Sequence, residues 1–140
     1  METIKKHNAI REAAMLKKAK QILLDSGDLL RASDICQLIG LTHTQLVQWV
    51  KDQKVFSVCL DNNEYYPVYA FNAHSQGKPL AAITKIINIF GKESSGLKIA
   101  FWFHAANSYL AGKCPKDIIM HNPNLAIHAA KIQVQGIQHG

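Results

Sequence analysis

Residues Gly40 to Lys51 read GLTHTQLVQWVK, which raises the question whether this helix reads DNA or only packs. The glycine ends a helical pattern over residues 33–39, for which Ser33 is the expected N-cap. A second helix restarts near Thr42. Its apolar residues return at helical spacing: Leu46, Trp49 and Val50. Two short helices separated by a glycine-containing turn are typical of the helix-turn-helix unit.

The segment that follows predicts a β-hairpin. Residues 54–60 (KVFSVCL) and 65–71 (YYPVYAF) are rich in β-branched and aromatic side chains, and the DNNE sequence between them favours a turn. Pro67 is expected on an edge strand or at a bulge, because proline has no N–H to give to the ladder. A two-stranded hairpin directly after a helix-turn-helix is typical of a wing.

The rest of the chain is mainly helical in pattern. The polar segment 72–78 is expected to be a linker, and Pro79 is expected in the first turn of the helix after it. Helices are expected at residues 2–25, 79–90, 97–110, about 116–120 and 123–135. These patterns predict a mainly α fold: a winged helix-turn-helix with one β-hairpin in residues 1–76, followed by a small C-terminal helical bundle in residues 77–140.

The outer face of the second short helix carries side chains suited to DNA. Thr44, Gln45, Gln48 and Lys51 project away from the apolar face, and Lys54 follows at the base of the hairpin. Glutamine and threonine bond base edges, and lysine pairs with phosphate. An ordinary amphipathic helix with a solvated outer face has the same pattern. The formal net charge of +6 and the hairpin favour DNA binding.

Composition limits the other classes of function. Three cysteines without a C-x-x-C spacing indicate reduced thiols, and no histidine pair has the spacing of a structural zinc site. There is no glycine-rich phosphate or oxyanion loop, so an enzyme is not expected. No stretch approaches the roughly 18 apolar residues that span a bilayer. We therefore expect a soluble cytoplasmic protein without metal, cofactor or membrane contact.

Residues 97–110 (LKIAFWFHAANSYL) carry more apolar surface than one helix face needs. One wide stripe is expected to be buried: Ile99, Trp102, Phe103, Ala106, Tyr109 and Leu110. Leu97 and Phe101 lie on the opposite side, beside His104. Two interpretations stay open: a helix buried on both sides within the bundle, or a surface for a protein partner or a dimer.

Residues 90–123 (FGKESSGLKIAFWFHAANSYLAGKCPKDIIMHNP) resemble the toxin-binding domain of Xre/MbcA/ParS-type antitoxins. That family's pattern is a tryptophan-containing helix, an asparagine before a leucine, a glycine pair, then a proline and an acidic residue that open a short helix. The corresponding residues are Trp102, Phe103, Asn107, Leu110, Ala111, Gly112, Pro115, Asp117, Asn122 and Pro123. The resemblance covers about residues 79–135, and Ala111 departs from the glycine pair.

The front half, residues 32–58 and 65–71, is similar to the winged helix-turn-helix of MerR-like or excisionase-like proteins. The antitoxin resemblance implies a cognate toxin with a RES-type fold, which the C-terminal domain blocks, and repression of the protein's own operon. The candidate partner-binding residues are Leu97, Phe101, His104, Lys113 and Lys116. The basic C-terminal half would steer association with an acidic toxin surface.

The sequence therefore predicts an antitoxin-like regulator that binds operator DNA through its N-terminal part and a cognate toxin through its C-terminal part. A homodimer is expected, because helix-turn-helix proteins commonly pair two half-sites. Either the first helix or the Leu97 and Phe101 surface would supply the dimer contact. Two alternatives remain: a protein-interaction module without DNA function, and a stand-alone winged-helix transcriptional regulator without a toxin partner.

Overall fold

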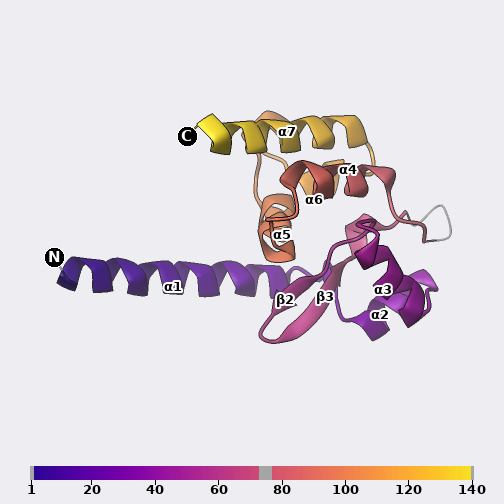
Figure 1. The fold of residues 1–140 in the computed structure, drawn as a ribbon, viewed down its shortest axis with the longest axis horizontal. Coiled ribbons are helices and arrows are strands. Elements are labelled where there is room, and N and C mark those ends of the chain that lie inside the picture. The colour runs from indigo at the N-terminus through magenta and orange to yellow at the C-terminus, as the bar shows by residue number, and fades with distance from the viewer. Residues whose placement is uncertain (1, 73–76, 140) are drawn as a thin grey trace.

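The computed structural model describes residues 2–72 and 77–139, and it confirms a mainly helical protein, with a small three-stranded antiparallel sheet (Figure 1). In chain order the elements are α1 (Glu2–Asp25), β1 (Leu29–Leu30), α2 (Ala32–Ile39), α3 (His43–Lys51), β2 (Val58–Leu60), β3 (Asn63–Pro67), η1 (Val68–Ala70), α4 (Ala81–Phe90), α5 (Gly96–His104), η2 (Ser108–Leu110), α6 (Pro115–Ile118) and α7 (Pro123–His139). The labels η1 and η2 denote 3₁₀ helices. No helix within the described ranges has both the length and the apolar character needed to cross a membrane.

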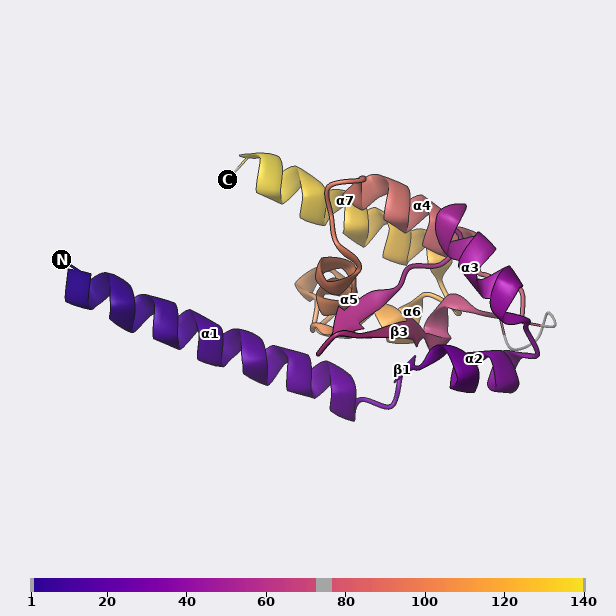
Figure 2. The same ribbon diagram turned by 60° about the horizontal axis from the view of Figure 1, so that its bottom comes forward.

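Helix α1 projects away from the rest of the molecule in both views (Figures 1 and 2). Its side chains from residue 5 to residue 18 are exposed, and Met15 and Ile22 are 65% and 59% exposed. Burial begins only near its end, where Leu23 enters the core. The helix then stops at a turn in which Gly27 has a φ of 76°. Most of α1 is therefore not covered by any other part of the chain that the structure describes.

Helices α2 and α3 meet at a tight turn. Gly40 has a φ of 84°, in the left-handed region that glycine adopts at little cost, and its N–H donates to the carbonyl of Cys36 at 2.8 Å. The expectation that Ser33 caps α2 is wrong. Helix α2 begins at Ala32, two residues after the last residue of β1. Arg31 occupies the N-cap position and forms no side-chain hydrogen bond there. Ile35 and Leu46 are fully buried and hold the two helices against the core.

The predicted hairpin forms between β2 and β3, with Val58 opposite Tyr65 and Leu60 opposite Asn63. Asp61 and Asn62 have φ angles of 50° and 64°, as the tight two-residue turns of hairpins require. The twist of such turns matches that of the flanking strands, and asparagine and aspartate tolerate positive φ.

The expectation of only two strands is wrong, because β1 pairs with β3 and makes β3 the central strand. Pro67 is therefore not on an edge strand. It is the last residue of β3, opposite Leu29, where its missing N–H interrupts the ladder only at its end. The next backbone N–H, that of Val68, donates to the carbonyl of Asp28 at 2.9 Å and continues the pairing.

Pro79 also lies outside its predicted helix. Helix α4 starts at Ala81, because Leu80 N–H donates to Ala70 carbonyl at 2.8 Å and Pro79 forms a β-bridge with Phe71. Most of the predicted linker, residues 73–76, lies outside the described residues. On either side of it, the N–H of Asn72 donates to the carbonyl of Lys78 at 2.8 Å, so the two ends of the segment are held together.

The predicted single helix over residues 97–110 is interrupted. Helix α5 ends at His104, and Ala105 is extended. Asn107 then caps η2 through a 2.9 Å bond from the N–H of Tyr109 to its side-chain oxygen. An asparagine side chain that bonds nearby backbone competes with helical hydrogen bonding, which is the physical reason for the break. Ala106 and Tyr109, which were expected in the buried stripe, are exposed.

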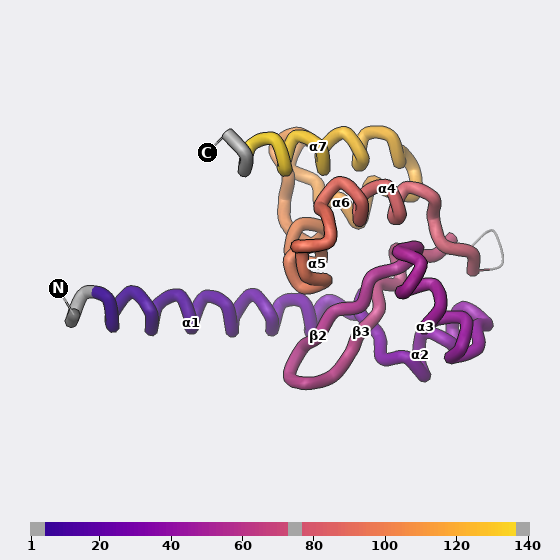
Figure 3. Tube along the Cα trace, in the orientation of Figure 1, coloured from indigo at the N-terminus to yellow at the C-terminus, as the bar shows by residue number. Residues whose placement is uncertain are grey.

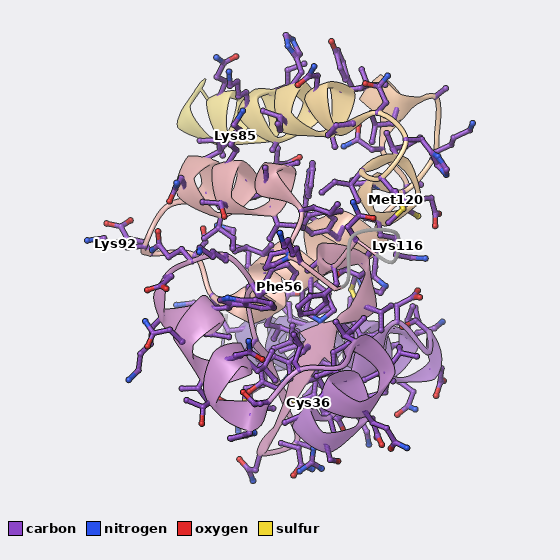
Figure 4. All side chains as sticks on the ribbon, turned by 90° about the vertical axis from the view of Figure 1, so that its right-hand side faces the viewer. Cys36, Phe56, Lys85, Lys92, Lys116 and Met120 are labelled. Atoms are coloured by element: carbon purple, nitrogen blue, oxygen red, sulfur yellow. The ribbon has the colours of Figure 1, made fainter. Side chains whose placement is uncertain are left out.

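The buried residues form one hydrophobic cluster that includes side chains from both predicted halves. Phe56, after α3, stacks on Phe103 of α5 with ring centroids 5.7 Å apart, and Phe56 lies in the centre of the molecule in Figure 4. Helices α4 and α7 pack side by side over this cluster (Figure 3). The division into parts 1–76 and 77–140 stays a prediction, and the two parts share a core.

Candidate functional site

The outer face of α3 is exposed along the whole helix. The predicted DNA-binding residues Thr44, Gln45, Gln48, Lys51 and Lys54 are all exposed in the structure. Leu46, on the opposite face, is fully buried, so the orientation of α3 is fixed by the core. All five residues are therefore accessible, four of them on α3 and Lys54 three residues after its end.

Two of these side chains already have partners within the helix. Gln45 Oε1 accepts a 3.1 Å hydrogen bond from the N–H of Thr42, and Thr42 Oγ1 accepts one of 3.1 Å from the N–H of Gln45. This reciprocal capping box fixes the start of α3. Gln48 Nε2 donates to Asp52 Oδ1 at 3.0 Å, which leaves the Gln48 carbonyl oxygen available to a ligand. Thr44 and Lys51 can reach a ligand without breaking such a bond.

A cleft of about 540 Å³ lies at the start of α3, between α2 and the tip of the hairpin. Its lining is polar and of mixed charge: Arg31, Ala32, Ser33, Asp34, His43, Asn62, Asn63, Glu64 and Tyr66. The guanidinium of Arg31 lies over the ring of Tyr65, 5.7 Å from its centroid. Sequence reasoning missed Arg31, because its position beside the hairpin depends on β1 pairing with β3.

A second cleft, of about 590 Å³, lies where α3 ends and α4 begins. It is lined by Trp49, Lys54, Lys78, Pro79, Leu80, Ala81, Thr84 and Lys85. Only Lys54 was among the predicted site residues. Lys78 and Lys85 belong to the second half of the chain, and nothing in their local sequence indicates that they lie beside α3. α3 thus has a cleft at each end, and the one at its C-terminal end contains only basic charges.

The five predicted partner-binding residues do not form an exposed patch. Leu97 and Phe101 are half-buried against the core. This favours the first of the two open interpretations, a helix that is covered on both sides within the bundle. His104 and Lys116 are half-buried as well, and only Lys113 is exposed. Neither Leu97 nor Phe101 is among the large apolar side chains that are exposed in the described part of the chain, and their role in partner binding stays a prediction.

His104 and Lys116 instead take part in polar contacts within the chain. His104 Nε2 lies 3.2 Å from the hydroxyl of Tyr69, and Lys116 Nζ lies 3.0 Å from Asp28 Oδ2. Burial, together with the nearby Lys116 charge, lowers the pKa of His104, and Asp28 and Asp117 only partly offset this. Burial also acts to lower the pKa of Lys116, but its contacts with Asp28 and Asp117 outweigh that effect and raise it.

An exposed apolar surface occurs elsewhere in the C-terminal half. Tyr109 and Ile132 are 45% and 38% exposed, and both line a cleft of about 200 Å³ between η2 and α7. The Tyr109 ring stacks on His128 with centroids 5.3 Å apart, so its position is fixed. Sequence reasoning missed this surface because it placed Tyr109 in the buried stripe of an unbroken helix.

Within the described ranges, no group of three His, Cys, Asp or Glu side chains is arranged to hold a metal ion. The three cysteines are unpaired thiols. Burial raises the pKa of Cys36, so its thiol is less readily ionised than usual. The described cysteines therefore show neither a disulfide nor the arrangement of an activated nucleophile.

The residues that carry the antitoxin resemblance mostly shape the fold. Trp102 and Phe103 are buried, and Pro115 is the first residue of α6. Ala111 and Gly112 both have positive φ, 58° and 84°, so the glycine pair of the family pattern corresponds to two left-handed positions. In comparisons with protein-family models, curated proteins and solved structures, this chain had no significant match. The resemblance stays a prediction.

Proposed function

We propose that this protein is a DNA-binding transcriptional regulator in which α2, α3 and the β2–β3 hairpin act as a winged helix-turn-helix. The observation that carries the proposal is the uncovered polar face of α3, which is held outward by the buried Leu46 on the opposite face. An α-helix with its side chains is about 10–12 Å across, so α3 fits the major groove, which is about 12 Å wide.

The chemistry of the face supports base reading by α3. Thr44 lies in the first turn, where recognition helices commonly contact base edges. Gln48, one turn later, keeps its carbonyl oxygen available as an acceptor, and Lys51 would pair with a phosphate. The hairpin tip, with Asn62 and Asn63, lies across a cleft from the start of α3, in the position of a wing.

The regulator would act as a dimer and repress its own operon. One short helix reads only a few base pairs, and pairing two half-sites supplies the missing specificity. Helix α1 is the candidate contact, since Met15 and Ile22 are exposed on its projecting length. In proteins most of the stability of a helix comes from tertiary packing, which favours a covering partner for the exposed part of α1.

Selection of binding sites from a random duplex pool tests the proposal. We expect an enriched sequence and a loss of about 1–3 kcal/mol in affinity for it in Gln48→Ala, the usual cost of one base contact. Asn88→Ala, an exposed change on α4, is the matched control. A pool without enrichment, or equal affinities of the Gln48→Ala and wild-type proteins, would contradict the assignment of α3 as reader.

We further propose that the C-terminal part binds a protein, and that the surface is the η2–α7 cleft with Tyr109 and Ile132. Two apolar side chains of this size, exposed beside a cleft, favour association with a protein. The resemblance assigns the partner as a cognate toxin with a RES-type fold. Co-expression with the product of the neighbouring gene should then give a stoichiometric complex that survives nuclease treatment.

Tyr109→Ser with Ile132→Ser should release this partner, and Lys98→Ser, at an exposed residue of the same half that is in neither candidate set, should not. A complex unaffected by the double change would exclude the cleft as the binding surface. Binding through DNA phosphates must weaken as salt rises. Absence of any such salt-sensitive DNA binding, with salt-insensitive protein binding retained, would favour the alternative of an interaction module without DNA function.

A further inference from the structure

We propose that the cleft between α3 and the start of α4 seats phosphates of the DNA backbone, so that Lys78 and Lys85 of the second half take part in DNA binding. This inference rests on the proposed function and extends the DNA surface beyond the winged helix-turn-helix. The cleft has a volume of about 590 Å³ and is formed by side chains from both halves of the chain.

The charge of this cleft is of one sign. Lys54, Lys78 and Lys85 line it, and its lining includes no acidic side chain. None of the three lysines forms an ion pair within the part of the chain that the structure describes, where the ion pairs all involve Lys116. Three ammonium groups around one cleft repel each other, and an anion between them relieves that repulsion.

The cleft at the other end of α3 provides a contrast within the same molecule. Its lining includes two acidic residues, Asp34 and Glu64, against one basic residue, Arg31, so negative charge is in excess there. Lys116 also differs from the three cleft lysines, because Asp28 already neutralises it at 3.0 Å, and it lies on the opposite side of the view in Figure 4 from Lys85. The α3–α4 cleft is therefore the place on this face where an anion would be most strongly attracted.

The uncharged part of the lining fits the rest of a nucleotide backbone. Trp49 forms one wall, and its ring is supported by Phe71 at a centroid distance of 6.1 Å. Pro79 and Leu80 add apolar surface of the kind that contacts deoxyribose. A cleft with lysines and an apolar wall suits alternating phosphates and sugars better than a free inorganic anion, because an inorganic anion has no apolar surface to pack against that wall.

The position of the cleft fits the groove geometry of the proposed function. Lys51 is exposed in the last turn of α3, and Lys54 follows three residues later at the edge of the cleft. A helix lying in the major groove has a phosphate backbone along each side of the groove. The cleft would receive one of these backbones where α3 leaves the groove, with Lys78 and Lys85 reaching it from the start of α4.

The test compares Lys78→Ala with Lys85→Ala, made together, against a double change of equal charge, Lys5→Ala with Lys6→Ala. All four lysines are exposed, and Lys5 and Lys6 lie on the projecting helix α1 (Figure 1), before its proposed dimer contact at Met15 and Ile22. The affinity of each full-length protein for duplex DNA is measured at several salt concentrations. Each lost phosphate contact lowers the slope of log affinity against log salt by about 0.9.

For each DNA-bound protomer, we expect the cleft variant to lose about 1.8 from this slope and about 60-fold in affinity at 0.1 M salt, since two contacts each contribute about 0.9 log units there. The α1 variant should match the wild type, and Lys78→Arg with Lys85→Arg should retain binding because the charges remain. Ethylation of individual phosphates should show interference sites in the wild type that disappear in the cleft variant.

The outcomes separate the two proposals. DNA binding by the wild type, with an unchanged slope in the cleft variant, overturns the cleft assignment and leaves the proposed function standing. No DNA binding by the wild type overturns both. Equal slope losses in the cleft and α1 variants would show a general effect of net charge and would also overturn the cleft assignment.

Discussion

The capping box of α3 separates two roles for Gln45, one in stability and one in reading DNA. Gln45 Oε1 and Thr42 Oγ1 each accept a 3.1 Å bond from the other residue's N–H. We expect Thr42→Ala to lower the free energy of unfolding by about 1 kcal/mol, the usual cost of losing a threonine N-cap. Gln45→Ala should cost about 0.5 kcal/mol, because the exposed N–H of Thr42 is returned to water and is not buried.

The two bonds form one reciprocal unit, so their losses should not add. In a double-mutant cycle, Thr42→Ala with Gln45→Ala should lose about 0.5 kcal/mol less than the sum of the single changes. Urea unfolding followed by far-UV circular dichroism measures these values. Thr44→Ala is the control, because Thr44 is exposed on the same helix and outside the capping box, and it should change stability by less than about 0.5 kcal/mol.

Additive losses, or a Gln45→Ala protein as stable as the wild type, would refute this account of the capping box. In the second case Gln45 would not be held by Thr42 in solution. A fall in DNA affinity without a fall in stability would then assign Gln45 to base contact. The capping box therefore has to be measured before any DNA-binding defect of a Gln45 variant is interpreted.

Three further perturbations have defined outcomes. Because the fold lowers the pKa of His104, the contribution of its neutral form to stability is fully present above the ordinary pKa of 6.5, and stability should fall as the pH drops below that value. His104→Gln should reduce this difference in stability, as measured by urea unfolding at pH 5 and pH 7. A Cβ at Gly96 would overlap the carbonyl oxygen of Ser57, so Gly96→Ala should lower the free energy of unfolding by about 1–3 kcal/mol. A Cβ at Gly136 in helix α7 would have nothing within 4 Å, so Gly136→Ala should raise the free energy of unfolding by up to about 1 kcal/mol. Thermal unfolding measures both changes. Met15→Lys on α1 should convert the proposed dimer to a monomer in light scattering, and an unchanged mass would exclude that contact.

Features set by local chemistry could be predicted from the sequence. Gly40 ends α2 and Thr42 begins α3 because each acts through bonds to residues at most four positions away. The turn at Asp61 and Asn62 is equally local, since asparagine and aspartate tolerate positive φ. The exposed face of α3 followed from helical periodicity alone, and its four candidate residues Thr44, Gln45, Gln48 and Lys51 are exposed; their role in binding DNA stays a prediction.

Features set by distant contacts could not be predicted. Strand β1 has only two residues, which is too short for a periodic pattern, and it exists because it pairs with the end of β3. The end of α5 at His104 is an exception, because it is a local feature that was still missed: the helical periodicity of residues 97–110 hid the start of η2, where Asn107 accepts a hydrogen bond from the N–H of Tyr109. The lysine cleft beside α3 depends on Phe71 pairing with Pro79, which places the start of α4 there.

The shared core implies that the two ends of the molecule affect each other. Phe56 stacks on Phe103 at 5.7 Å, and Asp28 pairs with Lys116 at 3.0 Å, so contacts on both the apolar and the polar side join the two halves. A ligand stabilises whatever folds together with its site. If DNA binds at α3 and a protein binds beside η2, each ligand will stabilise the same folded core, which contains both sites. By thermodynamic linkage any such coupling must be reciprocal. A regulator that senses its protein partner needs this property, and a chain of two independent modules would lack it.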